Sequence, residues 1–264
     1  MHVLLVGLGN MGMKYLAKLE ELKELPVLCD IDPYKNVSGY PFYCHFGDVK
    51  ENLKRVIVAV DPKHHVEIAH EFLSRGIPVL LEKPPATTSA EFREIAQDRN
   101  LEISEVELYS FPVRNFPRDL VVEEILIERL SGGRGFINPL WDLAWHDLYV
   151  LQYLLGEVRL DGCREGRVWE VEGYAGGVPF RLRVAWEYGG DTVRRWVMKT
   201  SRGEAVMDFV REEIRLGGRV LGGKRTDKLK EMVRDFLEGR RREGSTARAL
   251  KNLELLGGVR VWSS

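Results

Sequence analysis

Short apolar runs alternate with segments of helical periodicity through residues 1–110. Strands are predicted for the apolar runs at 3–6, 26–29, 55–60, 77–81 and 101–109. Helices are predicted between them at 13–23, 61–75 and 88–99, from apolar spacing and from capping residues at their starts. Strands so continuously apolar are buried on both faces. The pattern therefore predicts an α/β domain with a doubly wound parallel sheet that ends near Ser110.

Residues 111–264 show a different pattern. Helices are predicted at 119–130 and 141–155, and two more close the chain at 229–237 and 245–256. Runs of strand character, most of them separated by glycine-rich joints, lie at 167–174, 180–186, 192–200, 205–210 and 213–216. Such a series predicts a second domain, 111–264, built on an antiparallel sheet with one face covered. The C-terminal helices are free to pack back on the first domain.

Composition narrows the class of protein. The 264 residues are 44% hydrophobic and 30% charged, which excludes a disordered chain. Lys plus Arg number 39 and Asp plus Glu 40, so the net charge of −1 gives no general attraction to nucleic acid or anionic lipid. Three scattered cysteines and the absence of a long apolar stretch predict a cytoplasmic protein without a membrane span.

A glycine-rich turn follows the first predicted strand and opens the first predicted helix. It reads Gly7-Leu-Gly9-Asn10-Met11-Gly12, the pattern G-x-G-x-x-G. Gly7 permits the tight turn, Gly9 lets a pyrophosphate approach the backbone, and Gly12 allows close helix–strand packing. The helix N-terminus at Asn10 and Met11 adds N–H groups for the phosphates. The alternative is a turn that uses its glycines for geometry alone.

Asp30 lies at the end of the second predicted strand, where a carboxylate accepts hydrogen bonds from the adenine ribose. A carboxylate there repels a 2′-phosphate, and Asp32 adds to this repulsion. NAD is therefore the expected cofactor. NADP stays possible because Lys35, close by in the sequence, is able to bind a phosphate.

Glu82-Lys83-Pro84 follows the predicted strand at 77–81. It therefore lies at the carboxyl end of a parallel strand, where doubly wound sheets bind their ligands. Lys83 in this place can donate a hydrogen bond to a substrate hydroxyl and stabilise an alkoxide. The alternative is a surface lysine stiffened by Pro84 and Pro85.

Asp142 and His146 are four residues apart on a predicted helix, which places them on one face. A histidine takes a hydroxyl proton near neutral pH, and a neighbouring carboxylate can orient the ring or bind a substrate hydroxyl. The alternative is that Asp142 caps the helix and His146 packs in the core. Trp141 and Trp145 share this spacing and belong either to the core or to the wall of a pocket.

These elements together resemble the glucose–fructose oxidoreductase / inositol dehydrogenase / MocA family. The likeness is close over residues 1–110 and loose beyond. Its motifs are, in order, Gly7-x-Gly9-x-x-Gly12, Asp30, Asp61-Pro-Lys-His-His65, Gly76-Ile-Pro-Val-Leu-Leu-Glu82-Lys83-Pro84, Asp142-x-x-x-His146 and Leu154-Leu-Gly156.

The resemblance implies a Rossmann domain followed by an α+β domain with an open, mainly antiparallel sheet, which in that family often forms a dimer interface. A homodimer or homotetramer through this sheet is therefore expected. The implied reaction is NAD(P)-dependent hydride transfer at the carbinol carbon of a sugar, cyclitol or related polyol. His146 would be the acid–base, Lys83 would assist it, and Asp142 would bind and orient. Asp61, His65, Glu82 and Lys83 would join the glycine turn and Asp30 in holding the cofactor.

The sequence departs from the family pattern on the substrate side. Ala144 stands where the family commonly has glycine, and Tyr149 where it commonly has a second acid. Two other functions stay open: an imine or enone reductase on the same scaffold, and a non-catalytic dinucleotide-binding regulator. Catalysis predicts that Lys83 and His146 converge on one substrate.

Overall fold

The computed structural model describes residues 1–135, 137–223 and 226–263. The chain forms two compact units. The first comprises Met1–Glu105 and Leu229–Leu253, and the second comprises Val106–Lys228 and Glu254–Ser264.

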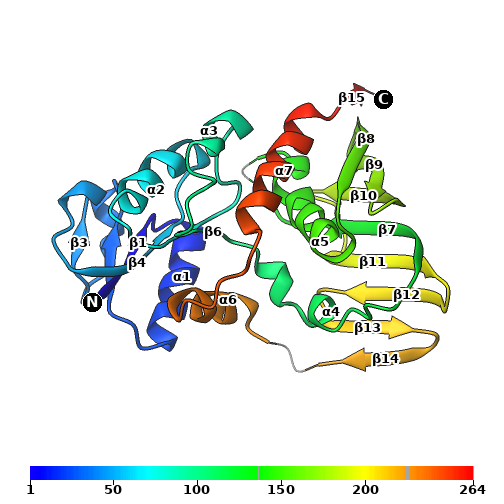
Figure 1. The fold of residues 1–264 in the computed structure, drawn as a ribbon, viewed down its shortest axis with the longest axis horizontal. Helices are drawn as coiled ribbons and strands as arrows, with labels where there is room; N and C mark the ends of the chain where they lie inside the picture. The colour runs from blue at the N-terminus through cyan, green and yellow to red at the C-terminus, as the bar shows by residue number, and fades with distance from the viewer. Residues whose placement is uncertain (136, 224–225, 264) are drawn as a thin grey trace. The chain divides into compact units, whose positions relative to one another are not determined.

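The first unit contains a six-stranded, all-parallel sheet (Figure 1). Its strands are β1 (His2–Val6), β2 (Pro26–Cys29), β3 (Phe42–Tyr43), β4 (Leu53–Val58), β5 (Val79–Leu81) and β6 (Leu101–Ile103). They lie in the order β3-β2-β1-β4-β5-β6, so the direction of winding reverses between β1 and β4. This order, with helices between the strands, confirms the predicted doubly wound α/β fold.

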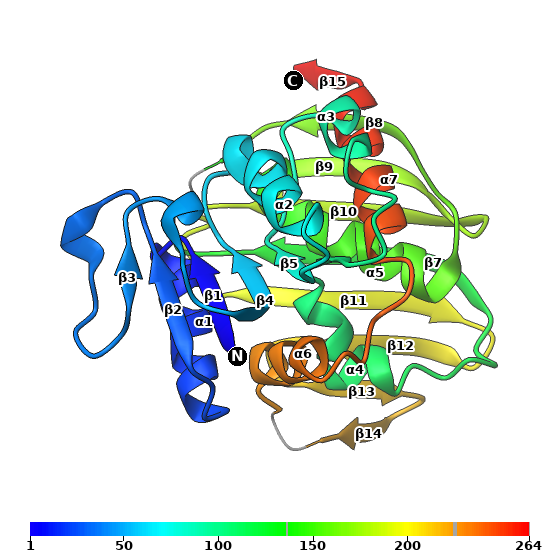
Figure 2. The ribbon, with the colours of Figure 1, turned by 60° about the vertical axis from the view of Figure 1, so that its left-hand side comes forward.

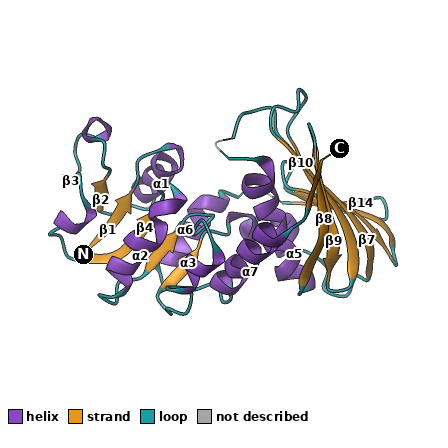
Figure 3. Cartoon of the chain, turned by 90° about the horizontal axis from the view of Figure 1, so that it is seen from above, coloured by secondary structure: helices purple, strands orange, loops and turns teal. Residues whose placement is uncertain are grey.

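Helices cover both faces of this sheet. They are α1 (Asn10–Glu21), α2 (His65–Leu73), α3 (Ser89–Arg93) and, from the end of the chain, most of α6 (Lys228–Leu237) and part of α7 (Ser245–Gly258). Helices α1 and α2 lie on opposite faces (Figures 2 and 3). The late helices are held by long-range polar contacts: Arg55 donates to the Phe236 carbonyl at 3.1 Å, and Arg248 forms two hydrogen bonds with Glu105.

The second unit is built on a nine-stranded mixed sheet in the order β14-β13-β12-β11-β7-β10-β9-β8-β15. Its strands are β7 (Val122–Leu130), β8 (Val158–Glu165), β9 (Trp169–Ala175), β10 (Val178–Ala185), β11 (Val193–Thr200), β12 (Gly203–Asp208), β13 (Glu213–Leu216), β14 (Arg219–Gly222) and β15 (Val261–Ser263). All pairs are antiparallel except β7 with β10 and β8 with β15. A mainly antiparallel open sheet was predicted and is confirmed.

One face of this sheet packs against α5 (Trp145–Leu155), which follows a π-helical turn at Leu140–Ala144 (Figure 3). The side chains of this inner face are largely apolar, including Ile125, Ile127, Leu182 and Trp196, each at most 1% exposed. Shorter elements complete the described chain: α4 (Phe111–Arg114) and 3-10 turns at Pro33–Lys35, Phe46–Asp48, Pro62–His64 and Val106–Tyr109.

The opposite, outer face of the sheet is a lattice of ion pairs. Glu128 on β7 lies between Arg183 and Arg195, at 2.9 and 2.7 Å. Arg181 pairs with Glu172 at 3.2 Å. Such a face is compatible with water, so it does not by itself require that another copy of the chain cover it. The homo-oligomer stays a prediction.

The helix predicted at 119–130 is wrong, because Val122–Leu130 is the strand β7. Its glutamates and leucines favour a helix locally. However, β7 lies between β10 and β11 in the middle of the sheet, and the burial of Ile125, Ile127 and Arg129 follows the alternation of a strand. Pairing on both edges overrides the local helix propensity.

Several predicted elements are shorter in the structure, among them the helix at 61–75, which is α-helical over His65–Leu73, and the strand at 77–81, which is Val79–Leu81. The strand predicted at 101–109 ends at Ile103, and a 3-10 turn occupies Val106–Tyr109. The helix predicted at 88–99 is regular only over Ser89–Arg93, although the Thr88 hydroxyl caps it by accepting from the Glu91 amide at 3.2 Å. Strands β3, β8, β14 and β15 had no counterpart in the prediction.

Candidate functional site

The glycine turn lies where the sheet of the first unit reverses its winding. Gly7 follows β1 with φ of +94°, and a Cβ on it would lie 2.4 Å from the Ala59 carbonyl oxygen after β4. A Cβ on Gly12 would lie 1.8 Å from the Gly7 carbonyl oxygen. Both positions therefore require glycine for the fold itself, the first for its backbone angle and the second for the approach of α1 to the turn.

Gly9 differs from these two glycines. Its φ is −76°, and a Cβ on it would meet no atom within 4 Å. The backbone of an ordinary residue would thus fit, and the protein itself gives no reason for glycine here. Open space beside this residue, which immediately precedes α1, is what a bound pyrophosphate requires.

The N-terminus of α1 is free to bind an anion. Within residues 1–135, no side chain caps it, and its first turn contains no acidic residue. Asn10 is exposed and Met11 half-buried at this end. The positive end of the helix dipole and its N–H groups face the open space at Gly9. These residues fit the diphosphate of NAD.

Asp30 follows β2 and is only 6% exposed. Its Oδ2 accepts from the Leu8 amide of the glycine turn at 2.7 Å, and its Oδ1 accepts from the Asp32 amide at 3.0 Å. Lys35 forms an ion pair with it at 3.2 Å. Burial works against the charged form, but these hydrogen bonds and Lys35 hold the pKa of Asp30 below its usual value. The ionised carboxylate therefore ties the glycine turn to the end of β2.

Lys83 is held at the end of β5 by the residue before it. Glu82 is buried, and its carboxylate accepts the Tyr15 hydroxyl from α1 and the amide of Lys83 at 3.1 Å. Ser104 Oγ lies 3.2 Å from the same Tyr15 hydroxyl. The Lys83 side chain is half-buried. Through its hydrogen bond to the amide, Glu82 positions Lys83, and contact between Glu82 and the cofactor stays a prediction.

His65 is also fixed by protein groups. It is fully buried, with Nδ1 2.8 Å from the Pro84 carbonyl oxygen and Nε2 3.0 Å from that of Val60. It thereby links α2 to the Glu82-Lys83-Pro84 segment and supports the site from behind. Asp61 is exposed and accepts from the Lys63 amide at 3.1 Å as the cap of a 3-10 turn.

Burial lowers the pKa of His65 from 6.5 to about 4, although the two carbonyls favour its charged form. The unfolded chain therefore binds one proton more than the folded protein between these values. We expect this group to remove about 3 kcal/mol from the free energy of unfolding as the pH falls from 6.5 to about 4. Urea unfolding of the wild type and His65→Gln at both pH values checks this. An equal fall in both proteins would contradict it.

In the second unit, His146 stands out on α5. From Leu143 to Leu151 it is the one residue that is not fully buried. Its Nδ1 lies 3.1 Å from the hydroxyl of Tyr149, which also accepts from the Glu107 amide at 2.9 Å. The residue that replaces the family's second acid thus orients the histidine ring through a neutral hydroxyl. Its partial exposure contradicts the alternative of a core histidine.

Asp142 lies in the π-helical turn and is half-buried. The side chain of Asn138 caps this helical segment, because its Oδ1 accepts from the Trp141 amide at 3.0 Å. Asp142 is therefore not needed as the cap. The wider π turn changes the angle between Asp142 and His146 from that of a regular α-helix. Trp145 belongs to the core, with 1% of its surface exposed, and Trp141 is half-buried.

A buried ion cluster anchors the helix next to His146. Asp147 accepts from Arg129 Nε at 2.6 Å, from Arg129 Nη2 at 3.2 Å and from the Trp196 indole at 2.8 Å. Glu107 accepts from Arg129 Nη1 at 3.1 Å and from Lys228 at 2.8 Å. Burial alone would raise the pKa of Glu107, but Arg129 and Lys228 hold it at about 2. The cluster fixes β7, α5 and β11 to one another.

The sequence analysis identified the residues proposed to contact cofactor and substrate, but not the buried residues that hold them in place. Tyr15, Arg129, Asp147 and Arg194 were missed. Arg129 carries the one usable signal, since a charged residue among the apolar positions of a strand implies a buried partner. The structure brings Gly7, Gly9, Gly12 and Asp30 together in the first unit, and His146 and Tyr149 together in the second. Lys83 and His146 belong to different units, so their convergence stays a prediction.

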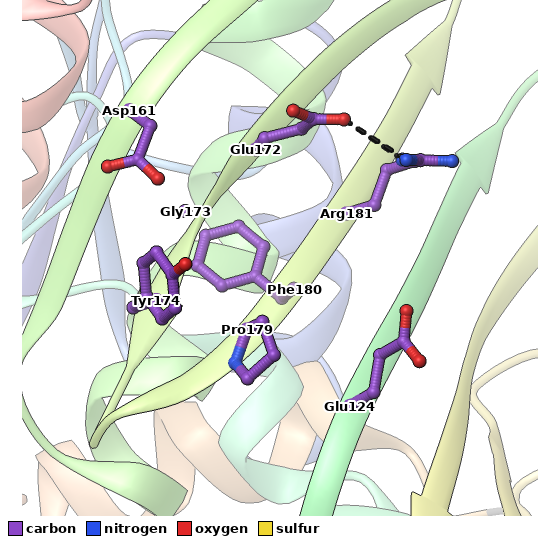
Figure 4. A pocket seen from close by; sticks show the side chains of 8 residues that line it. All are labelled: Glu124, Asp161, Glu172, Gly173, Tyr174, Pro179, Phe180 and Arg181. Carbon is purple, nitrogen blue, oxygen red and sulfur yellow. Dashed lines mark hydrogen bonds and ion pairs between the residues drawn. The ribbon is translucent and has the colours of Figure 1, made fainter.

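A separate depression lies on the outer face of the nine-stranded sheet (Figure 4). Arg181 and Glu172 point toward each other there, and none of the candidate site residues lines it. The lining residues are Glu124, Asp161, Glu172, Gly173, Tyr174, Pro179, Phe180 and Arg181. It belongs to the ion-pair lattice of the outer face and contains no histidine or lysine for acid–base chemistry.

The described residues 1–135, 137–223 and 226–263 contain no group of three or more His, Cys, Asp or Glu side chains placed to hold a metal ion. None of their helices combines the length and the apolar character that a membrane crossing needs.

A parallel sheet of this strand order, with an open glycine turn at its switch point, defines a dinucleotide-binding Rossmann domain. Residues 1–100 match the family model GFO_IDH_MocA, described as an oxidoreductase family with an NAD-binding Rossmann fold. The first 100 residues are thus similar to an oxidoreductase family with an NAD-binding Rossmann fold, which confirms the resemblance seen in the sequence. Comparison with curated protein sequences gives no match.

Solved structures share the fold of the whole chain. UDP-N-acetylglucosamine 3-dehydrogenase from Acidithiobacillus ferrooxidans is 17% identical with a TM-score of 0.85, over 98% of this chain and 96% of that one. D-galactose-1-dehydrogenase from Rhizobium etli is 17% identical with a TM-score of 0.81, over 100% and 97%. A 3-ketoreductase from Actinomadura kijaniata, solved with TDP-benzene and NADP, is 15% identical with a TM-score of 0.83, over 100% and 99%.

The role of Gly9 is tested by a substitution that the fold itself tolerates. Gly9→Val should abolish NADH binding and leave the protein folded, because the side chain fills space that only the pyrophosphate uses. Gly257→Val is the control, at a glycine whose Cβ direction is equally open. Fluorescence titration with NADH and circular dichroism measure the two properties. Undiminished NADH binding by folded Gly9→Val would show that the turn does not hold the diphosphate.

Proposed function

We propose that the protein transfers a hydride between NAD(P) and the carbinol or carbonyl carbon of a sugar, cyclitol or related polyol. The observation that carries this proposal is the state of His146. It is the one residue open to solvent on a buried stretch of helix, and its ring is oriented by Tyr149. The sugar-converting enzymes that share the fold support the substrate class.

The glycine turn, the N-terminus of α1 and Asp30 would hold the cofactor, which supplies a nicotinamide carbon that accepts or donates the hydride. Lys83 would donate a hydrogen bond to the substrate oxygen and stabilise the negative charge that develops on it. Glu82 fixes the backbone of Lys83, so the ammonium starts from a defined point. Asp142 would accept a hydrogen bond from a second hydroxyl of the substrate.

His146 would take the hydroxyl proton during oxidation and return it during reduction. With a proton on Nδ1, the ring donates to the Tyr149 oxygen, and the Nε2 lone pair is the base. A tyrosine hydroxyl both donates and accepts, so it can keep a hydrogen bond to Nδ1 in both protonation states of the ring. Because this partner is neutral, it stabilises the imidazolium less than a carboxylate would.

We further propose NAD as the preferred cofactor. The buried, ionised Asp30 stands at the ribose end of the site, where a 2′-phosphate would meet its negative charge. Lys35 is engaged by this carboxylate at 3.2 Å, so it would have to leave its partner before binding a phosphate.

A screen of neutral and anionic sugars, cyclitols and polyols with NAD and NADP, and of imines and enones with NADH and NADPH, tests the function. We expect reduced nicotinamide to appear with at least one polyol, with a larger kcat/KM for NAD than for NADP. Turnover confined to C=N or C=C substrates would favour an imine or enone reductase. NADH binding without turnover of any substrate would favour a regulatory dinucleotide-binding protein.

A further inference from the structure

We propose that Arg194 binds an oxyanion of the substrate, a carboxylate or a phosphate, next to the acid–base residue His146. This inference rests on the proposed function, because it assigns the substrate class of that same site. All the residues on which it rests lie in the second unit.

Arg194 lies on the inner face of the sheet, at the start of β11. Its register partner on β7 is Arg129, and paired residues share a face. Arg129 binds Asp147, the residue that follows His146 on α5. Arg194 therefore lies at the ion cluster that anchors α5 beside His146, and its charge interacts with both Asp147 and Glu107.

The acids nearest to Arg194 are already occupied. Both oxygens of Asp147 accept from Arg129, and one also accepts from Trp196. The two oxygens of Glu107 accept from Arg129 and Lys228. These carboxylates attract Arg194 through space, but they do not use its N–H groups.

In the part of the chain that the structure describes, the Arg194 guanidinium forms no hydrogen bond or ion pair, although the residue is half-buried. Burial, and then repulsion from Arg129, lowers the pKa of Arg194. A guanidinium has five donors in a fixed planar arrangement that matches a carboxylate or phosphate. A half-buried group of this kind gains most from a ligand that brings two acceptor oxygens.

The neighbouring residue gives the contrast. Arg195 follows Arg194 in β11, so its side chain lies on the outer face of the sheet, where it is exposed and pairs with Glu128 at 2.7 Å. Two adjacent arginines thus differ in face, exposure and partner. Arg195 serves the ion-pair lattice, and Arg194 is left for a ligand.

Isothermal titration of the NADH-loaded full chain tests the inference with four probes that share one sugar. They are D-glucose, D-glucuronate, D-glucose 6-phosphate and UDP-glucose. We expect at least one anionic probe to bind about 10–100-fold more tightly than glucose, as a charge-assisted pair of hydrogen bonds allows. The three anionic probes distinguish a carboxylate from a phosphate and from a diphosphate.

Arg194→Gln should remove this preference without changing the weak binding of glucose, and Arg194→Lys should keep part of it. Arg195→Gln is the matched control and should keep all of it. The inference is wrong if no anionic probe binds more tightly than glucose, or if the preference survives Arg194→Gln. Because binding is measured without turnover, failure of hydride transfer would count against the proposed function and would leave this result unaffected.

Discussion

Replacing His146 with glutamine is expected to lower kcat by about 10²–10⁴-fold, the contribution typical of a positioned acid–base group. Glutamine keeps a polar side chain of similar length but cannot take or return a proton. The affinity for NADH should stay unchanged, because the residues proposed to hold the diphosphate lie in the first unit. Steady-state kinetics with a substrate from the screen, together with NADH titration, measure the two effects.

The control for this variant is His70→Gln, at an exposed histidine on α2 that belongs to no part of the site. Its kcat should equal that of the wild type. If His146→Gln retained full turnover, His146 would not be the acid–base. If it lost NADH binding as well, the substitution would be acting on the structure, and the assigned role would lose its support.

The second large effect is expected on stability. Asp147→Asn should lower the free energy of unfolding by about 3–5 kcal/mol, because it removes one partner of a buried ion pair. Arg129 and Asp147 expose only 3% and 2% of their side chains, so water cannot solvate the guanidinium once the carboxylate is gone. Urea unfolding measures the change.

The exposed pair Arg181–Glu172, with side chains 58% and 56% exposed, provides the control. Glu172→Gln should alter the free energy of unfolding by less than about 1 kcal/mol. The double variant Asp147→Asn/Arg129→Met should lose less free energy of unfolding than the two single variants lose together, because the two residues stabilise each other. Strict additivity would contradict the direct pairing of Arg129 with Asp147.

The first unit was largely predictable, because its signals are local. Gly7, Gly9 and Gly12 lie in one short turn, and the physical reason for each glycine follows from the strand before it and the helix after it. The strands of a parallel sheet covered on both faces are continuous apolar runs, so they are visible without knowledge of their neighbours. The lengths of β5, β6, α2 and α3 were overestimated, and the short strand β3 was not predicted.

The second unit was less predictable, because its elements depend on partners far away in the sequence. Strand β7 has helical propensity and becomes a strand through β10 and β11. The buried charge of Arg129 needs Asp147 and Glu107, which are 18 and 22 residues away. The strand predicted at 192–200 already puts Arg194 and Arg195 on opposite faces, and only the pairing of β11 with β7 shows which of them faces inward.

The central claim is hydride transfer from a polyol carbon to the nicotinamide, and an isotope label tests it most directly. A polyol that turns over in the screen is prepared with deuterium on its carbinol carbon and incubated with the enzyme and NAD. Mass spectrometry then measures the mass of the reduced cofactor. We predict that the product NADH carries one deuterium from the substrate, and that His146→Gln forms it far more slowly. Reduced cofactor without the label, or oxidised substrate without reduced cofactor, would contradict the proposed function.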